Sequence, residues 1–353
     1  MRIAEVAPLF ESVPPKLYGG TERVIAYLVN ELARQGHEVT LFASGDSRTE
    51  AKLVATIDAA LRLNPRIVDW LPHYLVMLEE VFRHKDRFDI VHFHVDYLHF
   101  PLSRSEGITQ VSTLHGRLDL PDLAPLYREF AEMPVVSISD AQRAPLPHLR
   151  WMSTIHHGLP PNLYRLRKQP GRYLAFVGRI SPEKRVDRAV EIAERVGIPL
   201  KIGAKIDRAD RAYFEHIREI FNHPLVEYVG EVSQESKQKF LGEALALLFP
   251  IDWPEPFGLV MIEAMACGTP TIAFRRGSVA EIIEEGVSGF IVDDVPAAAQ
   301  AVHRALSFDR ERCRRAFEQR FTASRMVGDY LFVFSRLLED RFRPLRLARK
   351  SVS

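Results

Sequence analysis

The chain has 353 residues, of which 46% are hydrophobic and 26% charged, a composition that excludes disordered and collagen-like proteins. At roughly 100–200 residues per domain, this length predicts two domains with room for a cleft. The 47 Lys and Arg residues balance 46 Asp and Glu residues, which excludes a surface built throughout for nucleic acid. Any recognition of charge must therefore be local.

The cysteine content and the N-terminus bear on the compartment. Cys267 and Cys313 lie too far apart for a paired-thiol motif and are too few for a zinc site, so we expect them to serve packing in a reducing compartment. Residues 1–6 lack the apolar core of a signal peptide, and no run reaches the roughly 18 apolar residues of a membrane-spanning helix. We expect a cytoplasmic protein.

Short apolar runs alternate with amphipathic segments, a pattern that predicts parallel sheets covered by helices. In the first half, Val24, Leu28 and Leu32 recur at helical spacing, which predicts a helix over about 21–35 that ends at Gly36. The strands expected in this half are 2–7, 38–43, 89–94, 110–115, 134–138 and 153–157.

The segment 160–172 contains three prolines and several basic residues, which is typical of a linker. After it the alternation restarts, with a helix expected over about 184–196. The strands expected in this half are 173–177, 199–203, 225–230, 244–249, 271–274 and 289–292. Two doubly wound sheets in series would place the carboxyl ends of their strands at a cleft, where ligands of such sheets generally bind.

A Gly19-Gly20 pair lies between the first expected strand and the first expected helix. Two glycines allow backbone amides to approach a phosphate at a helix N-terminus, although a plain tight turn explains the pair equally well. The loop lacks the three spaced glycines of dinucleotide-binding proteins, which argues against NAD or FAD.

Four histidines cluster in the first half: His92, His94, His99 and His115. His94 and His115 fall at the carboxyl ends of expected strands, where a ligand would bind. A metal site, packed polar side chains and hydrogen bonding to a substrate are the alternatives, with the metal site ranked last because no further ligand can be placed.

The sequence from Gly178 to Lys184 follows the first strand of the second half. Arg179 and Lys184 at the entrance to a helix can hold a diphosphate, the guanidinium as a fork and the ammonium as a point charge. A solvated loop whose charges do little is the alternative.

The stretch 255–270 is the most informative. Residues 259–266 form an expected helix that is apolar nearly all round and ends at Gly268, so Glu263 at its centre needs a partner. Eight positions separate Glu255 from Glu263, about 12 Å if the stretch is wholly helical, close to the reach from the sugar to the ribose of a nucleotide sugar. A structural pair of Glu263 with an Arg is the alternative.

Taken together, these motifs resemble those of the retaining glycosyltransferases of family 4, and the likeness runs from residue 1 to about 340. It rests on Glu255 with Glu263, on Gly178, Arg179 and Lys184, and on Gly19 with Gly20. The resemblance implies an α/β GT-B fold of two facing Rossmann-like domains with parallel sheets. The domains implied are 1–162 on the acceptor side, joined by a crossover helix at about 324–340, and 171–323 on the donor side.

The resemblance also implies roles for individual residues. Arg179 and Lys184 would bind the donor diphosphate and stabilise the charge of the leaving nucleotide, while Glu255 binds sugar hydroxyls and Glu263 the ribose. His94 would face the sugar near its anomeric carbon. The other donor-side positions are Gly19, Gly20, Phe257, Gly258, Leu259, Ser278 and Glu281, and the acceptor-side candidates are His115 and Glu22.

The chain departs from the family where His156, His157 and Gly158 stand in place of an Asn-Gly turn, and it contains no Asp-x-Asp triplet. We therefore expect no metal and no other cofactor. Retention requires either a covalent intermediate on a carboxylate or front-face attack guided by the leaving phosphate. Because the resemblance places Glu255 at sugar hydroxyls, front-face attack is favoured.

The predicted function is transfer of a hexose from UDP-glucose, with GDP-mannose next, to a hydroxyl of a saccharide, lipid-linked or small-molecule acceptor, forming an α-glycosidic bond. A nucleotide-sugar epimerase of the same fold and a non-catalytic nucleotide-sugar binding subunit are the alternatives. No nucleic-acid partner is expected. The basic tail 341–353 is either a solvated end or a weak contact with anionic membrane lipid.

Overall fold

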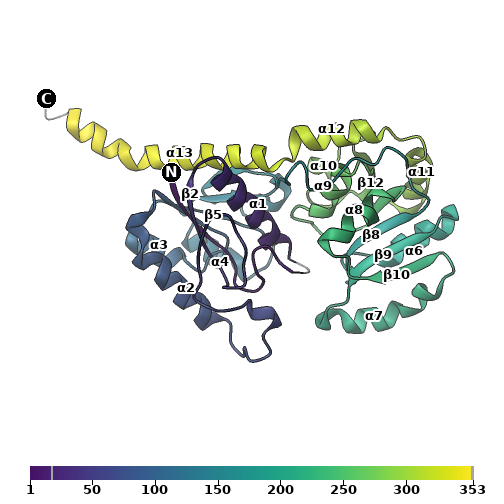
Figure 1. Cartoon of the computed structure of the whole chain (residues 1–353), viewed down its shortest axis with the longest axis horizontal. Coiled ribbons are helices and arrows are strands. Elements are labelled where there is room, and N and C mark those ends of the chain that lie inside the picture. The colour runs from purple at the N-terminus through teal and green to yellow at the C-terminus, as the bar shows by residue number, and fades with distance from the viewer. Residues whose placement is uncertain (17–18, 351–353) are drawn as a thin grey trace. The chain divides into compact units, whose positions relative to one another are not determined.

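The computed structural model of the chain describes residues 1–16 and 19–350, including all of their side chains except those of Leu63 and residues 341–350 (Figure 1). The described chain divides into two compact units. The first unit contains Met1–Ile138, Arg143–Gly158 and the chain from Ala323 onward, and the second contains Ser139–Gln142 and Leu159–Thr322.

The first unit is built on a seven-stranded parallel sheet in the order β3-β2-β1-β4-β5-β6-β7. The strands are β1 (Arg2–Val6), β2 (Glu38–Phe42), β3 (Lys52–Val54), β4 (Ile90–Phe93), β5 (Gln110–Thr113), β6 (Val135–Ser137) and β7 (Trp151–Thr154). The sequence did not predict β3, and β7 lies two to three residues before its predicted position. The central strand β1 is buried from Ile3 to Val6, because it has a neighbouring strand on each side.

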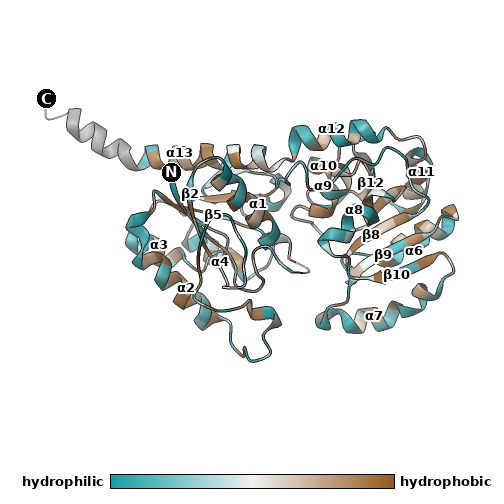
Figure 2. Ribbon diagram, in the orientation of Figure 1, coloured by the Kyte–Doolittle hydropathy of each residue, from teal (hydrophilic) through white to brown (hydrophobic). Residues whose placement is uncertain are grey.

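Helices cover this sheet, and the helix predicted after the Gly19-Gly20 pair is confirmed as α1. The helices are α1 (Gly20–Arg34), α2 (Leu71–Arg83), α3 (Phe100–Glu106), α4 (Leu123–Glu129) and α13 (Ala323–Lys350), with short 3₁₀ turns at Leu61–Leu63 and Lys85–Arg87. Helix α13 packs against α1. It alternates between hydrophobic and hydrophilic residues, as a helix buried on one face does (Figure 2).

The second unit is built on a six-stranded parallel sheet in the order β10-β9-β8-β11-β12-β13, the strand order of a doubly wound nucleotide-binding sheet. The strands are β8 (Leu174–Arg179), β9 (Leu200–Lys205), β10 (Val226–Gly230), β11 (Ala246–Phe249), β12 (Thr271–Phe274) and β13 (Gly289–Val292). All six were predicted, with shifts of at most two residues at their ends.

The helices of the second unit are α6 (Val186–Val196), α7 (Arg211–Ile217), α8 (Gln234–Gly242), α9 (Leu259–Ala266), α10 (Val279–Ile282), α11 (Val295–Ala305) and α12 (Arg310–Arg320), with 3₁₀ turns at Arg208–Asp210 and Arg218–Asn222. Helices α6 and α11 pack together over one face of the sheet. The short helix α5 (Asp140–Arg143) lies at the point where the chain passes between the units. Helix α9 has its predicted bounds and ends before Gly268, where φ is +79°.

These features confirm the predicted fold class, in which two parallel-sheet, Rossmann-like units are followed by a C-terminal helix that returns to the first unit. Among the described residues, no helix combines the length and apolar character needed to cross a bilayer. The backbone of α13 continues into the basic tail, whose side chains from residue 341 onward lie outside the described residues, so both predictions for that tail stay open.

Both cysteines are buried free thiols, as packing residues would be. Burial raises the pKa of Cys267 to about 12 and raises that of Cys313 further. Both side chains therefore remain protonated at neutral pH.

Candidate active site

Lys184 and Glu255 form the centre of a charged cluster at the carboxyl ends of β8 and β11, which are neighbours in the second sheet. The ammonium of Lys184 donates to Oε2 of Glu255, and the indole Nε1 of Trp253 donates to the same oxygen at 2.9 Å. The Lys184 ammonium also lies 4.9 Å from the centre of the Trp253 ring. The indole thus holds both members of the ion pair in place.

Arg179, the last residue of β8, belongs to a second group of charges. Its guanidinium pairs with Glu183, and its Nε lies 3.0 Å from Oδ2 of Asp210. Burial raises the pKa of Asp210 although Arg179 opposes the shift. The Arg179 side chain is 34% exposed, so its guanidinium remains accessible to a ligand.

The turn from Arg276 to Ser278 supports the loop that carries Glu255. The buried hydroxyl of Ser278 donates to the carbonyl of Phe257 at 2.9 Å, and its amide donates to the carbonyl of Glu255 at 3.0 Å. Gly277 has a φ of +52°, and a Cβ there would lie 2.4 Å from the backbone N and O of Glu255. Only glycine permits this approach, so Gly277 and Ser278 fix the position of the loop.

The loop leads into the N-terminus of α9. Gly258 precedes the helix with a φ of +80°, and Leu259 is its first residue. The first amides of any helix lack partners within that helix, so the amides around Gly258 and Leu259 can bind an anion. The stretch from Glu255 to Glu263 is therefore not wholly helical, and the 12 Å separation predicted on that assumption does not apply.

Glu263 is buried in α9 with defined partners. Its two carboxylate oxygens lie 2.8 and 3.0 Å from the Lys237 ammonium, and Oε1 also accepts from the Tyr164 hydroxyl at 3.0 Å. The sequence anticipated a partner for this buried carboxylate but named an Arg, whereas the structure supplies a Lys from α8.

Glu281 in α10 has a different surrounding. Its carboxylate oxygens accept hydrogen bonds of 2.7 Å from the amides of Asp140 and Ala141, within the segment Ser139–Gln142 that groups with the second unit. The structure thus separates Glu281, which anchors a backbone segment, from the loop contacts made by Ser278.

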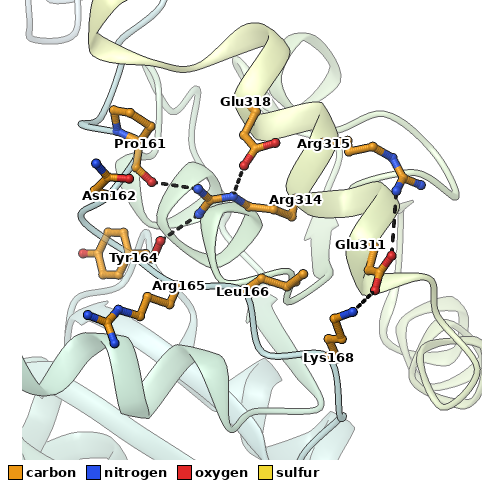
Figure 3. A pocket seen from close by; sticks show the side chains of 10 residues that line it. All are labelled: Pro161, Asn162, Tyr164, Arg165, Leu166, Lys168, Glu311, Arg314, Arg315 and Glu318. Carbon is orange, nitrogen blue, oxygen red and sulfur yellow. Dashed lines mark hydrogen bonds and ion pairs between the residues drawn. The ribbon is translucent and has the colours of Figure 1, made fainter.

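The second unit also contains a cavity of about 600 Å³ between residues 161–168 and α12 (Figure 3). Arg314 crosses it and donates to the carbonyls of Pro161 and Tyr164 and to the carboxylate of Glu318. None of the predicted site residues lines this cavity. Its central arginine braces the first residues of the second unit, so we assign the cavity no part in the site.

In the first unit, Gly19 packs tightly before α1, since a Cβ there would lie 2.7 Å from Cβ of Pro15. Gly20 begins the helix, and Glu22 is buried in its first turn. Burial raises the pKa of Glu22 to about 7, opposed by a backbone hydrogen bond and reinforced by the nearby charge of Glu11. Leu17 and Tyr18, earlier in the same loop, lie outside the described residues.

The predicted histidine cluster surrounds a buried carboxyl group, that of Glu5 in β1. The strand register places Glu5 beside His92 of β4, and Oε2 of Glu5 lies 3.0 Å from Nδ1 of His92 and 2.8 Å from Nε2 of His94. The ligand atoms of these three residues lie within 4.8 Å of one another, a spacing that a cation could bridge. Hydrogen bonds account for the same spacing without one.

The cluster continues to His115, whose Nε2 lies 2.9 Å from Nδ1 of His94. The structure therefore brings together His94, which was predicted to face the donor, and His115, which was predicted on the acceptor side. By contrast, the imidazole of His99 is buried between the hydroxyls of Ser103 and Ser112, at 2.7 Å from each, as a packed polar side chain would be.

Comparison with known proteins identifies the family. A family model described as "Glycosyl transferases group 1" matches residues 165–320, and one described as "Glycosyltransferase Family 4" matches residues 18–190. The chain belongs to the family 4 glycosyltransferases. The predicted resemblance to family 4 glycosyltransferases is thereby confirmed.

Two distant relatives of this glycosyltransferase match along most of its length. It is 26% identical to the N-acetyl-alpha-D-glucosaminyl L-malate synthase of Bacillus anthracis, over 91% of this chain and 95% of that protein. It is 24% identical to the O-antigen chain mannosyltransferase C of Escherichia coli, over 97% of this chain and all of that protein.

Solved structures similar to this glycosyltransferase share its fold. AviGT4, a glycosyltransferase involved in avilamycin A biosynthesis, has a TM-score of 0.75 and 24% identity, over 96% of this chain and 98% of its own. Anabaena HepE in complex with UDP and glucose has a TM-score of 0.74 and 16% identity, over 95% of this chain and all of its own.

Several residues that contact the candidate site residues of this glycosyltransferase were missed from the sequence. Trp253 lies two positions before Glu255, close enough for the motif to have included it. Glu5 interrupts an otherwise apolar strand, which was a signal that a buried partner existed. Lys237 lies on a polar helix with nothing to distinguish it, so no local signal could have found it.

Proposed function

We propose that this glycosyltransferase is a retaining hexosyltransferase that uses a nucleotide diphosphate sugar and a hydroxyl acceptor. The observation that carries the proposal is the ion pair of Lys184 with Glu255 at the carboxyl ends of two adjacent strands. UDP-glucose is the leading donor, supported by the structural neighbour HepE, which has been solved with UDP-glucose. GDP-mannose is next, supported by the relationship to a mannosyltransferase.

In this proposal, Lys184 and Arg179 bind the donor diphosphate. An ammonium has three protons to donate, and Glu255 takes one of those of Lys184, which leaves others for phosphate oxygens. The guanidinium of Arg179 can exchange its carboxylate partners for a second phosphate oxygen. Both cations then stabilise the negative charge that grows on the leaving nucleotide.

In this proposal, Glu255 accepts hydrogen bonds from hydroxyls of the transferred hexose. Its oxygen Oε2 is held by Lys184 and Trp253, while Oε1 makes no hydrogen bond within the described part of the chain. A carboxylate anchored in this way is better placed to accept hydrogen bonds from sugar hydroxyls than to act as a nucleophile, which must move to the anomeric carbon. This favours front-face attack over a covalent intermediate.

In front-face attack, the bond between the anomeric carbon and the phosphate oxygen breaks while the acceptor oxygen bonds to the same face of the sugar. The acceptor hydroxyl loses its proton to the departing phosphate, so the product is an α-glycoside and a nucleoside diphosphate. Charge is balanced by the protein's own cations, and we therefore propose transfer without a metal. Activity should survive EDTA, and a loss that Mg²⁺ or Mn²⁺ reverses would contradict this part of the proposal.

Glu263 binds the ribose hydroxyls in this proposal while remaining paired with Lys237. Each carboxylate oxygen has two acceptor positions, so the contacts from Lys237 and Tyr164 fill Oε1 and leave one position on Oε2 for a ribose hydroxyl. The amides at Phe257, Gly258 and Leu259 bind phosphate oxygens at the start of α9.

A nucleotide screen followed by product analysis tests the proposal. Thermal unfolding with UDP, GDP or ADP should show a shift for one nucleotide at millimolar concentration, because ligand binding stabilises the folded state by RT ln(1+[L]/Kd). The matching nucleotide sugar should then be hydrolysed slowly, with an α-hexose detected first by NMR.

Each alternative gives a different result in that experiment. An epimerase of the same fold would convert the donor sugar as its main reaction. A binding subunit would show the thermal shift without hydrolysis, and no shift with any nucleotide would overturn the proposal as a whole.

A further inference from the structure

The first unit contains a chain of buried side chains that begins at Tyr330 of α13. Its hydroxyl lies 2.9 Å from Oγ1 of Thr113, which lies 2.8 Å from Nε2 of His92. A phenol is the more acidic of the two hydroxyls, so Tyr330 donates to Thr113. Thr113 then donates its single proton to Nε2 of His92, and His92 carries its own proton on Nδ1.

That proton of His92 points to Glu5, whose Oε1 and Oε2 lie 3.2 and 3.0 Å from Nδ1. Glu5 is fully buried, and within the described residues its carboxyl group contacts the imidazoles of His92 and His94 but no Lys or Arg. Burial raises the pKa of Glu5 and lowers the pKa of His92 and His94 to about 3. Full burial and the lack of a cationic partner both favour the neutral form of the Glu5 carboxyl group, and burial favours neutral imidazoles.

A neutral carboxyl group has one proton to donate, and its nearest acceptor is Nε2 of His94 at 2.8 Å. His94 must then carry its own proton on Nδ1, which donates to Nε2 of His115 at 2.9 Å. By the same logic, His115 carries its proton on Nδ1. That nitrogen is buried and has no hydrogen-bond partner within the described residues.

We propose that Glu5 is a positioning residue that orders the tautomers of His94 and His115, so that Nδ1–H of His115 donates to a hydroxyl oxygen of bound saccharide substrate. A buried N–H without a partner is unfavourable, and a hydroxyl oxygen is the acceptor that the proposed reaction brings. The inference rests on the proposed transferase function, because that function supplies the substrate. Glu5 acts through His94 and touches no substrate itself.

The tautomers can be read directly by long-range ¹H–¹⁵N NMR of the histidine side chains in ligand-free protein. We expect His92, His94 and His115 all to carry their protons on Nδ1. If Glu5 were ionised, His94 and His115 would instead carry their protons on Nε2, and that result would overturn the proposal.

Two variants of Glu5 separate its effect on the histidine tautomers from its effect on packing. In Glu5→Gln, the amide NH₂ replaces the acid O–H as donor to His94 and the amide oxygen still accepts from His92, so the tautomers should persist. Glu5→Met removes both functions, and the tautomers of His94 and His115 should change or become mixed. Should Glu5→Met not fold, the wild type and Glu5→Gln decide the question alone.

Rates provide the second readout. Glu5→Met should lower kcat ten- to a hundredfold with the donor KM changed less than threefold, and Glu5→Gln should recover most of that rate. Gln110→Met is the matched control, because Gln110 is a buried polar residue of the same sheet outside the chain of side chains. An equal loss of rate in both Glu5 variants would overturn the proposed role.

The NMR readout keeps this inference separate from the proposed function. If neither the wild type nor any variant transfers sugar but the three Nδ1–H tautomers are present, the transferase proposal fails while the ordering by Glu5 stands. EDTA should leave the spectrum unchanged, since hydrogen bonds alone hold the cluster. A spectrum that changes on chelation would reveal a cation bound by Glu5, His92 and His94 and would overturn the inference.

Discussion

The two units contain polar clusters of opposite kinds. In the second unit, the cluster of Lys184 and Glu255 consists of formal charges whose side chains are 16% and 11% exposed. In the first unit, Glu5 and His92 are fully buried and His94 nearly so, and burial favours the neutral form of all three. The cluster of the second unit interacts through formal charges close to solvent. The cluster of the first unit interacts through directional hydrogen bonds in the interior.

This difference teaches what each cluster can do. A partly exposed ion pair can exchange partners when an anionic ligand arrives, because water and the ligand compensate the charges during the exchange. Buried neutral groups cannot exchange partners without leaving a donor or acceptor unsatisfied. The second unit is therefore suited to binding charge and the first to fixing orientation. The following variants test that contrast, beginning with the largest expected effect.

Replacing Lys184 by Ala should lower the turnover of the donor by a factor of about 10² to 10³, if this cation stabilises the leaving nucleotide as proposed. Steady-state kinetics with the nucleotide sugar identified by the thermal screen measure the effect. Lys168→Ala is the control, because Lys168 is 71% exposed and pairs with Glu311 away from the cluster. Normal turnover in Lys184→Ala would refute the phosphate role.

Replacing Glu263 by Gln should destabilise the protein by about 3 kcal/mol, because it leaves the buried ammonium of Lys237 without a counter-charge. Urea denaturation measures this loss. Adding Lys237→Met should restore most of the stability without restoring nucleotide affinity. If the double variant also regains nucleotide binding, Glu263 serves only as a structural partner.

Replacing Glu22 by Gln should stabilise the protein at alkaline pH. Burial raises the folded-state pKa of Glu22 to about 7, above the ordinary value of 4.5 that applies to the unfolded chain. The free energy of unfolding therefore falls as the pH rises from the unfolded-state pKa to the folded-state pKa, because ionisation of Glu22 is less favourable in the folded protein. The Gln variant lacks this loss and should gain about 2 kcal/mol relative to wild type between pH 5 and pH 8. Urea denaturation at both pH values measures the gain, with the exposed Glu79→Gln as control. A difference in free energy of unfolding between Glu22→Gln and wild type that is the same at pH 5 and pH 8 would contradict the prediction.

Replacing Gly277 by Ala should reduce transfer about tenfold, because the new Cβ displaces the backbone of Glu255. Gly286→Ala is a matched control, since Gly286 also has a positive φ of +72° but no atom lies within 4 Å of the added Cβ. Kinetics of both variants separate displacement of the loop from backbone strain. Equal kinetics would show that the position of this loop does not matter.

The regular elements were largely predictable because their apolar patterns are local. Helix α9 and strands β12 and β13 have the predicted bounds, since buried runs between glycines and prolines leave few alternatives. Strand β3 was not predicted because it has only three residues at the edge of its sheet. Strand β7 was predicted two to three residues too late in the sequence, because its half-buried side chains give a weak apolar signal.

Candidate site residues could be proposed from the sequence only where they follow one another closely or end a predicted strand. Spacing indicated Glu255 and Glu263, and strand ends indicated Arg179 and His94. The partner of Glu263 was assigned to the wrong residue type because Lys237 is brought to it by packing of α8 on α9. Glu5 and His92 lie 87 positions apart and meet through strand pairing, which no local pattern encodes.

The burial of Cys267 and Cys313 makes the native protein chemically silent toward thiol reagents, because only a thiolate exposed to solvent reacts with a maleimide. No native cysteine would need to be removed before labelling. One cysteine introduced on the surface of each unit would thus carry a dye pair whose energy transfer follows the distance between the units as a nucleotide sugar binds and its product leaves.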